Sequence, residues 1–508
     1  MVASADQLAT QAGCAALARG GNAVDAAIAT NAAIAVTGPH LCGMGGDLFA
    51  LVHDGTSIHA LNASGRAGSG ADPAALRAEG HLHMPFRHDI RTVTVPGCVD
   101  GWSALHERFA RLTLRELFEP AIRLASDGFP ASPLLVGSVA ELDDRARANL
   151  HEIASQATRP GARVRRPGIA EALRDIADRG RDGFYGGRFG SGLIGLGAGN
   201  FSHDDLATPG ADWVSPISIE AFGRRIHTLP PNSQAYLLLA SAGLAERHGL
   251  PADPSDPRWA HVLIEAAKAA GRDRPDALWH GADGLSLLAE IARRDREIGP
   301  SALSISGPSA TGDTTYLCTI DAERMGVSLI QSNAAGFGSW LVEPATGVNL
   351  HNRGLGFSLE AGHPAELAAG ARPPHTLSPA LATTGDRLDA VFGTMGGDAQ
   401  PQILLQLAAR LFRHAQSPAA AIEAPRWILH GPRTGFDTWS GTGAPHVVVE
   451  GHGVDDWRSG LADRGHEVRV EPPFSSTFGH AHAIVVDGDG LLVGAADPRA
   501  VIGSAAGL

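Results

Sequence analysis

The stretch Gly312–Asp321 has the sequence GDTTYLCTID and lies about three-fifths of the way along the chain. Its first two residues are turn formers and the next are β-branched, aromatic or apolar, so a turn leading into a buried strand is the simplest interpretation. A second interpretation is that the chain cuts itself between Asp313 and Thr314. Thr314 would then carry a nucleophilic hydroxyl and also an α-amino group, whose pKa of about 7.7–8.0 suits a base near neutral pH.

Sequence on both sides of this stretch resembles the γ-glutamyltranspeptidase family of N-terminal nucleophile hydrolases. Residues 313–338 are similar to the start of the family's small subunit. Further segments follow in the family's order through the rest of the chain, among them Gly20–Ala27, Gly43–Phe49, Thr94–Gly97, Leu117–Ala121, Asp182–Tyr185, Leu229–Gln234 and Gly393–Asp398. The resemblance implies an α+β fold, a four-layer αββα sandwich. It also implies a helix-rich large subunit from residues 1–313 and a strand-rich small subunit from residues 314–508, with catalytic Thr314 at its start.

The resemblance assigns the parts of an acyl-transfer site. Ser332 falls where relatives have a threonine whose hydroxyl bonds the nucleophile, although a polar strand end explains Ser332 as well. Gly396 and Gly397 match paired glycines whose N–H groups face the oxyanion, and a simple turn is the alternative. Arg66 stands about two positions after the place of an arginine that holds the substrate carboxylate, and a surface arginine is the alternative.

Several positions depart from the family pattern where relatives bind the α-amino acid part of glutathione. Ala334 stands where they have an asparagine, and Gly356 stands where they have an acid that holds the α-amino group. His375 and Thr376 replace two serines and are expected to bind the substrate in their place. The amino-acid clamp is therefore largely lost, and Arg353, which the pattern lacks, is a candidate for binding a carboxylate instead.

We predict a self-processing amidohydrolase in which Thr314 attacks an amide carbonyl and forms an acyl-enzyme that water or an amine resolves. The family implies a γ-glutamyl donor such as glutathione. The lost clamp favours an alternative: a short acyl amide of the oxamate type or a β-lactam side chain. A catalytically inactive relative that acts as a binding protein is a third hypothesis. The expected partners are a small-molecule amide and the two subunits of one precursor, and a homodimer of these heterodimers would fit.

Composition excludes several other classes of function. The net charge is −13, from 41 basic and 54 acidic residues, which argues against nucleic acid as a main partner. Residues 43–46 lack the spacing of a phosphate-binding loop, so we expect a tight turn there. His81, His83 and His88 lack the pattern of a zinc site, and we interpret them as solvent-facing. No motif for a metal or another cofactor is present, and neither is expected.

The expected location is the cytoplasm. The four cysteines are scattered and form no CxxC pair, as is typical of a reduced protein. Residues 1–6 lack the basic and apolar regions of a signal peptide, although a truncated start would leave a periplasmic location open. The apolar run Val24–Val36 is shorter than the roughly 20 residues that a membrane span needs.

Hydrophobic patterning gives a coarse secondary structure. We predict helices at Gln7–Ala18 and Ala23–Val36 and a hairpin from Phe49–His53 and Ser57–Asn62. Residues 130–230 are predicted to be mainly helical, with a loop-rich centre. After Thr314 we predict strands, with helices at Ala399–His414 and Pro418–Ala424.

Overall fold

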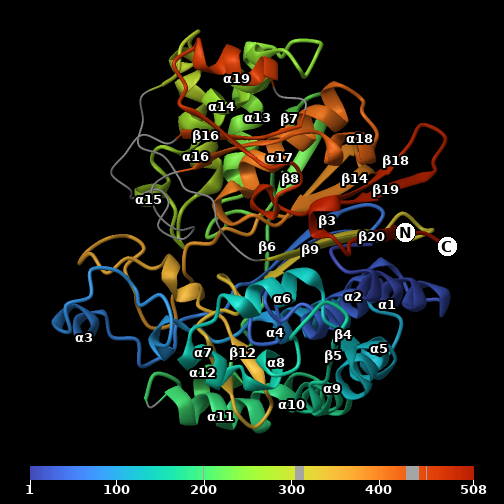
Figure 1. Ribbon diagram of the computed structural model, residues 1–508, viewed down its shortest axis with the longest axis vertical. Helices are drawn as coiled ribbons and strands as arrows, with labels where there is room; N and C mark the ends of the chain where they lie inside the picture. Colours follow the sequence, from blue (N-terminus) through green and yellow to red (C-terminus); the bar gives the residue numbers. More distant parts are fainter. Residues whose placement is uncertain (198, 304–313, 431–445, 453–454) are drawn as a thin grey trace.

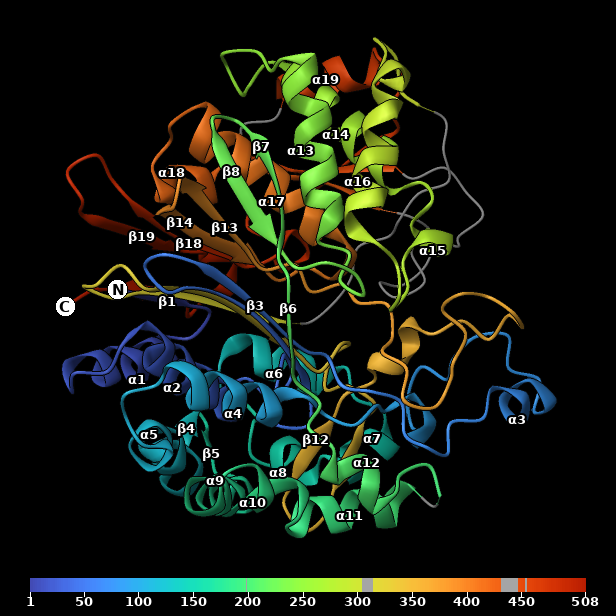
Figure 2. The same ribbon diagram turned by 180° about the vertical axis from the view of Figure 1, so that it is seen from behind.

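A computed structural model describes residues 1–197, 199–303, 314–430, 446–452 and 455–508. Two antiparallel sheets stack face to face, and a layer of helices covers the outer face of each sheet (Figures 1 and 2). The predicted four-layer αββα sandwich is therefore confirmed. Asp313 lies outside the described residues. None of the helices in the described ranges is long and apolar enough to cross a membrane.

The first sheet has seven strands and joins segments from the whole chain. In spatial order they are β20 (Ser504–Ala506), β1 (Val2–Ser4), β9 (Thr315–Ile320), β10 (Gly326–Ser332), β2 (Asp47–His53), β3 (Ile58–Ala63) and β6 (Asp212–Val214). The predicted hairpin at residues 49–62 is confirmed as β2 and β3. Every neighbouring pair is antiparallel. β9 pairs with β1 on one side and with β10 on the other, and therefore lies in the interior of the sheet.

The second sheet has six strands, again from distant parts of the chain. Their order is β19 (Leu492–Ala496), β18 (Ala481–Val486), β14 (Arg387–Thr394), β13 (Ala380–Thr384), β8 (Arg224–Thr228) and β7 (Ile217–Ala221). Both sheets thus contain strands from before and after residue 313. The division into residues 1–313 and 314–508 stays a prediction about processing, and it does not follow the layers of the fold.

Helices from the first half of the chain cover the seven-stranded sheet. They are α1 (Gln7–Ala18), α2 (Ala23–Thr37), α3 (Pro73–Ala78), α4 (Cys98–Phe109), α5 (Leu114–Asp127), α6 (Pro133–Ala140), α7 (Asp144–Asn149), α8 (His151–Ala154), α9 (Pro167–Arg179), α10 (Arg181–Tyr185), α11 (Arg188–Gly197) and α12 (His203–Ala207), with a few lying further out. The two predicted N-terminal helices are confirmed as α1 and α2. Asn22 begins α2 with a capping box, and every residue of α2 is buried against the sheet and α5, as its apolar sequence requires.

The upper helical layer packs on the six-stranded sheet. It comprises α13 (Tyr236–His248), α14 (Pro257–Gly271), α15 (Arg274–Ala277), α16 (Gly284–Ile291), α17 (Gln400–Ala408) with a π-helical turn at Ala409–Arg413, α18 (Pro418–Glu423) and α19 (Asp455–Ala462). Smaller strands are β4 (Phe129–Pro130), β5 (Arg163–Val164), β11 (Leu341–Glu343), β12 (Val348–Leu350), β15 (Trp427–His430), β16 (His446–Glu450) and β17 (Val468–Glu471).

The two sheets enclose a core of alternating side chains. It includes Phe49 and Leu51 from β2, Tyr316, Cys318 and Ile320 from β9, Ile330 from β10, and Leu381, Val391 and Ile484 from the opposite sheet. The residues between them in sequence, such as Leu317 and Leu329, face the helices instead. This period of two is what assigns each strand residue to a face.

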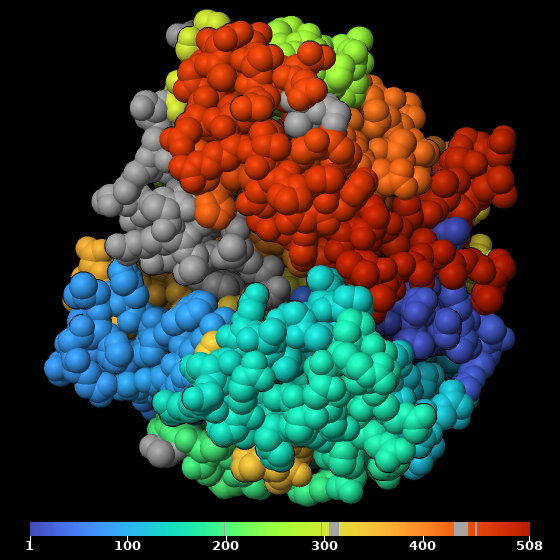
Figure 3. Space-filling view, in the orientation of Figure 1, coloured from blue at the N-terminus to red at the C-terminus, as the bar shows by residue number. Residues whose placement is uncertain are grey.

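The two ends of the chain meet at one edge of the molecule. β1 pairs with β20, with Val2 opposite Ala506. In the space-filling view the dark blue N-terminal helices and the red C-terminal segment lie side by side (Figure 3).

The prediction that residues 130–230 are mainly helical is wrong at its C-terminal end. Residues 212–228 form β6, β7 and β8. Apolar residues alternate there at Ile217 and Ile219, and Phe222-Gly223 forms the turn between β7 and β8, with both residues at positive φ. Strands of three to five residues contain too few alternating positions to stand out from their helical surroundings.

Candidate functional site

Three polar side chains lie where the apolar layer between the two sheets ends. In β10 and β2, Ser332 lies directly opposite Asp47, and Gln331 of β10 lies opposite Thr315 of β9. Thr314, one residue before Thr315, therefore falls beside Ser332. By the alternation along each strand, Thr314 shares a face with Tyr316, Ser332 with Ile330, and Asp47 with Phe49. Thr314, Ser332 and Asp47 thus form a row across three adjacent strands, at the rim of the core between the sheets.

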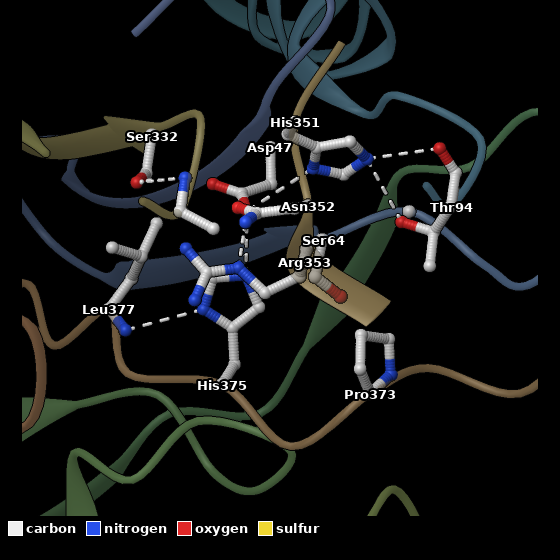
Figure 4. A network of polar contacts seen from close by, with 12 residues as sticks. Asp47, Ser64, Thr94, Ser332, His351, Asn352, Arg353, Pro373, His375 and Leu377 are labelled. Atoms are coloured by element: carbon white, nitrogen blue, oxygen red, sulfur yellow. Dashed lines mark hydrogen bonds and ion pairs between the residues drawn. The ribbon is translucent and has the colours of Figure 1, made fainter. Parts of the chain in front are cut away.

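The hydroxyls of Thr314 and Ser332 are in contact. Their oxygens lie 3.0 Å apart, and both residues are buried. The backbone N–H of Ala334 donates to Ser332 Oγ at 2.8 Å, which fixes the serine hydroxyl beside Thr314 (Figure 4). Ala334 has φ +75°, a conformation that non-glycine residues seldom adopt. The structure therefore brings together two of the predicted catalytic residues.

The glycine run before Asp47 forms a tight turn, as predicted. A Cβ on Gly45 would lie 2.0 Å from the carbonyl oxygen of Asn349, and one on Gly46 would lie 2.2 Å from that of Ser332. Only glycine permits these approaches. The turn packs against the end of β10 and delivers Asp47 to the site.

Asp47 is the centre of a buried polar group, called here the Asp47 cluster, which is formed by Asp47, Arg353, His375, His351 and Thr376. Arg353 Nε donates to Asp47 Oδ2 at 2.7 Å, and Arg353 Nη1 donates to Thr376 Oγ1 at 3.2 Å. His375 Nε2 lies 3.1 Å from the same Asp47 oxygen (Figure 4). Three residues that the sequence predicted as substrate ligands, Arg353, His375 and Thr376, therefore meet next to the Thr314–Ser332 pair.

The hydrogen bonds of His375 define its tautomer. The N–H of Leu377 donates to His375 Nδ1 at 3.3 Å, so Nε2 carries the hydrogen that is donated to Asp47. Burial and the nearby Arg353 lower the pKa of His375 to about 3, so the imidazole is neutral. Burial alone would raise the pKa of Asp47, but Arg353, His375 and His351 together hold it well below its usual range. The cluster thus holds one carboxylate and one guanidinium.

His351 connects the cluster to the loop before α4. Its Nε2 donates to the carbonyl oxygen of Thr94 at 2.9 Å, and its Nδ1 lies 3.7 Å from Asp47 Oδ2. His351 follows β12 and precedes the short 3₁₀ turn η3 (Arg353–Gly356). Arg353 is thus the first residue of η3, two positions after His351.

The predicted oxyanion glycines lie at the end of β14, in the opposite sheet. A Cβ on Gly393 would lie 2.1 Å from the ring of Tyr316 in β9. This end of β14 therefore packs against β9 close to Thr314, which is two residues before Tyr316 in the sequence. Gly396 and Gly397 follow with φ +137° and +54°, which favours glycine at both positions. Among the described residues, no acceptor bonds to the N–H of either glycine. Both glycines also precede α17, whose N-terminus favours negative charge.

Gln234 connects the glycine pair to the Asp47 cluster. Its Nε2 donates to the carbonyl oxygens of Thr376 at 3.0 Å and Gly397 at 3.2 Å. On the other side, Arg274 Nη2 lies 3.0 Å from the Asp398 carboxylate, directly after Gly397. Sequence reasoning did not single out Gln234, Arg274 or Asp398 for the site.

The backbone closes position 356, the place to which the family resemblance assigns the clamp acid. A Cβ on Gly356 would lie 2.3 Å from the carbonyl oxygen of Pro374 and 3.3 Å from Pro373 Cβ. No side chain fits there unless the 373–374 segment moves.

Arg66 is engaged in a different group of contacts. Its Nη2 pairs with Asp212 at 2.7 Å, and its Nη1 donates to the carbonyl oxygen of Gly370. Arg372 shares Asp212 with it. Within the described ranges, Arg66 contacts neither Thr314 nor Arg353, and its role as a substrate ligand stays a prediction.

Buried neutral histidines should make the protein labile to acid. Burial lowers the pKa to about 3 or 4 for His40, His227, His375, His466, His480 and His482. Below about pH 6.5 the unfolded chain takes up protons that the native state refuses, so stability that is full above this pH is lost as the pH falls. Each such histidine adds up to about 1.4 kcal/mol per pH unit. We expect the apparent urea midpoint to fall between pH 7 and pH 5.

His40 gives a direct check of this prediction. Neither ring nitrogen of His40 has a hydrogen-bond partner among the described residues. His40→Phe should therefore reduce the pH dependence of the urea midpoint by about one proton. An unchanged slope would show that His40 does not contribute to the pH dependence.

Comparisons with known proteins identify the family of the chain. The family model described as Gamma-glutamyltranspeptidase matches residues 9–507. The chain is 36% identical to an oxamate amidohydrolase proenzyme of Klebsiella pneumoniae, covering 100% of this chain and 98% of that protein. It is 34% identical to a glutathione hydrolase-like proenzyme of Bacillus subtilis, covering 98% and 97%. The solved structure of a cephalosporin acylase from Bacillus halodurans superposes with a TM-score of 0.88 at 34% identity, covering 98% and 94%.

Proposed function

Because the chain belongs to the γ-glutamyltranspeptidase family, we propose that it is a self-processing amidohydrolase with Thr314 as its N-terminal nucleophile, acting on short acyl amides whose acyl part carries a carboxylate. The observation that carries the substrate proposal is the buried Arg353, which Asp47 holds one strand away from the Thr314–Ser332 pair. Cleavage between Asp313 and Thr314 gives a large subunit of residues 1–313 and a small subunit of residues 314–508.

The nucleophile is activated by its own amine. After cleavage the α-amino group of Thr314 takes the proton of Oγ1, directly or through water, as Oγ1 attacks the amide carbonyl. The Ser332 hydroxyl, 3.0 Å from Thr314 Oγ1, orients the attacking oxygen. The proton then passes to the leaving amine as the C–N bond breaks, and water hydrolyses the acyl ester on Thr314.

The tetrahedral intermediate carries its negative charge next to the glycine pair. The N–H groups of Gly396 and Gly397 have no acceptor among the described residues, which supports their role as donors to the oxyanion. One such donor is typically worth about 2.7–4 kcal/mol of barrier. The N-terminus of α17 adds to the stabilisation.

Arg353 is proposed to bind the carboxylate of the acyl group. Its Nε and Nη1 donate to Asp47 and Thr376, which fixes a planar guanidinium of the kind that suits a carboxylate beside the Thr314–Ser332 pair. Asp47 acts as a positioning residue because it bonds Arg353 and His375 at once. No acid stands at position 356 to hold an α-amino group, and the backbone leaves no room for one. The site therefore suits an acyl group with a carboxylate and without an ammonium group.

The relatives support this substrate class. One protein that resembles this chain along its whole length is named for oxamate, an amide that carries a carboxylate, and a similar structure is named as an acylase. Another is named as glutathione hydrolase-like, so a γ-glutamyl donor is the second candidate.

A matched pair of substrates tests the proposal. Glutaryl-p-nitroanilide and γ-glutamyl-p-nitroanilide differ only in the α-amino group. We expect kcat/KM to be at least about ten-fold higher for the glutaryl compound, because an ammonium group without a partner is costly to bury. A third compound, the glutaramyl analogue, has a neutral carboxamide in place of the carboxylate. It should have the lowest kcat/KM of the three. Higher turnover of the γ-glutamyl compound would contradict the proposal.

Restoring the acid alone should not restore a γ-glutamyl site. In Gly356→Asp the new Cβ would lie 2.3 Å from the Pro374 carbonyl oxygen, so we expect destabilisation of about 1–3 kcal/mol and no gain in γ-glutamyl turnover. Gly195→Asp is the control, since nothing lies within 4 Å of a Cβ there. Thermal melts and kcat/KM check both variants, and a rise in γ-glutamyl turnover would show that the space opens readily.

A further inference from the structure

A buried polar group outside the candidate site binds the backbone of residues 299–303, which precede the proposed cleavage site. It consists of His261, Glu265 and Lys268 on α14 and His466 after α19, and is called here the Lys268 cluster. All four residues are buried, and Lys268 is the only lysine in the sequence. The helices α14 and α19 lie side by side at the top of the molecule (Figures 1 and 2).

The Lys268 cluster clamps both backbone groups of one residue. The N–H of Leu303 donates to Glu265 Oε2 at 2.7 Å, and Lys268 Nζ donates to the carbonyl oxygen of Leu303 at 3.3 Å. Lys268 Nζ also pairs with Glu265 Oε1 at 2.8 Å. The ion pair thus binds the backbone of Leu303 from two sides.

A directed chain of hydrogen bonds fixes a second point. Lys268 Nζ lies 3.4 Å from His466 Nδ1, which accepts from it. His466 Nε2 can then donate to His261 Nδ1 at 2.8 Å, and His261 Nε2 donates to the carbonyl oxygen of Gly299 at 2.8 Å. Each histidine is used once as donor and once as acceptor, so both are neutral. Ala302 is held separately by the carbonyl oxygen of Arg464.

The same side chains do not suit a metal ion. Ligand atoms of His261, Glu265 and His466 lie within 4.8 Å of one another. However, the Lys268 ammonium already supplies a positive charge at Glu265, and the two imidazoles bond each other. We therefore interpret the cluster as a set of hydrogen bonds around an ion pair.

A buried ion pair is a poor way to gain stability, since its desolvation offsets most of the attraction. What this one does supply is position for residues 299–303. These are the last described residues on the N-terminal side of the Asp313–Thr314 bond. On the other side, β9 and Ser332 hold Thr314. Attack on a carbonyl requires both partners to be placed within about 3–3.5 Å, and a misplacement of about 1 Å can cost 10²-fold in rate.

We propose that the Lys268 cluster is a positioning site for self-cleavage: by fixing Gly299 and Leu303 it sets the rate at which the precursor cuts itself, without a part in amide hydrolysis by the mature enzyme. The inference rests on the proposed cleavage at Thr314. Loss of the clamp removes the fixed points at Gly299 and Leu303, while the N–H of Ala302 still donates to the carbonyl oxygen of Arg464. Loop entropy alone would then slow cleavage by only about two-fold. A larger effect therefore measures lost positioning.

The test replaces the ion pair with an apolar pair. Glu265→Leu/Lys268→Met keeps the buried volume, and such exchanges often preserve folding. Cell-free synthesis followed by a chase on denaturing gels gives the cleavage rate. We expect it to fall about ten-fold, while kcat/KM of the matured double variant stays within about two-fold of wild type. The single variant Lys268→Arg keeps the cation and should cleave faster than the double variant. Asp389→Asn, which breaks a pair with Arg224 at the far end of β14, is the control for general destabilisation.

The outcomes separate the two proposals. If wild-type protein yields no fragment that begins at Thr314, the proposed function fails. If wild type cleaves and the double variant cleaves at the same rate, only the present inference fails. If the double variant is insoluble, Leu303→Pro decides, since it removes the N–H that Glu265 accepts and leaves the Glu265–Lys268 ion pair in place. Slower cleavage by five-fold or more supports positioning, and an unchanged rate overturns it.

Discussion

Thr314→Ala protein is expected to remain a single uncut chain and to lose amide hydrolysis by about 10⁴-fold or more, because the variant has neither a nucleophile nor a new N-terminal amine. Denaturing gels and kcat/KM on glutaryl-p-nitroanilide measure the two effects. Thr314→Ser keeps the hydroxyl and should retain both activities at a reduced rate.

The neighbouring residue offers a matched control. Thr315 is also buried, and its Oγ1 has no hydrogen-bond partner among the described residues. Thr315→Val should therefore cleave and hydrolyse as wild type does. Cleavage in Thr314→Ala, or its loss in Thr315→Val, would move the nucleophile away from Thr314.

Replacing Arg353 is expected to remove the preference for a carboxylate. Arg353→Lys keeps a charge and loses the planar fork, so we expect kcat/KM for the glutaryl substrate to fall about 30- to 10³-fold, or about 2–4 kcal/mol. Turnover of the neutral glutaramyl analogue should change by less than about three-fold. The ratio of the two substrates is the readout, because a general loss of folding lowers both equally.

Asp47 should show a related but smaller effect. Asp47→Asn keeps an acceptor for Arg353 Nε and removes the charge that holds it. We expect an intermediate loss of the glutaryl preference. If Arg353→Lys and Asp47→Asn lower kcat/KM for the two substrates by the same factor, the Asp47 cluster serves folding and not substrate selection.

The strands of the site could be predicted from the sequence, because their local signals agree with the fold. The β-branched and apolar run after Thr314 becomes β9, and the glycine run before Asp47 becomes a tight turn. The resemblance to the family also identified Ser332, whose contact with Thr314 is present in the structure. Its role in catalysis, like that of Gly396 and Gly397, stays a prediction.

Partners that are distant in sequence could not be predicted. Asp47 and Arg353 are 306 positions apart, and only the pairing of β10 with β2 and the turn after β12 bring them together. One signal was present, an acidic residue at the start of the buried strand β2, since a buried charge requires a partner. Arg274 lies on a four-residue helix that gives no sequence signal for its contact with Asp398.

The most direct measurement is the intact mass of freshly purified wild-type protein under denaturing conditions. We predict two fragments whose masses correspond to residues 1–313 and 314–508, with an unblocked threonine at the start of the smaller one. A single chain of 52.5 kDa, or a cut at any other bond, would contradict the assignment of Thr314 as both nucleophile and base.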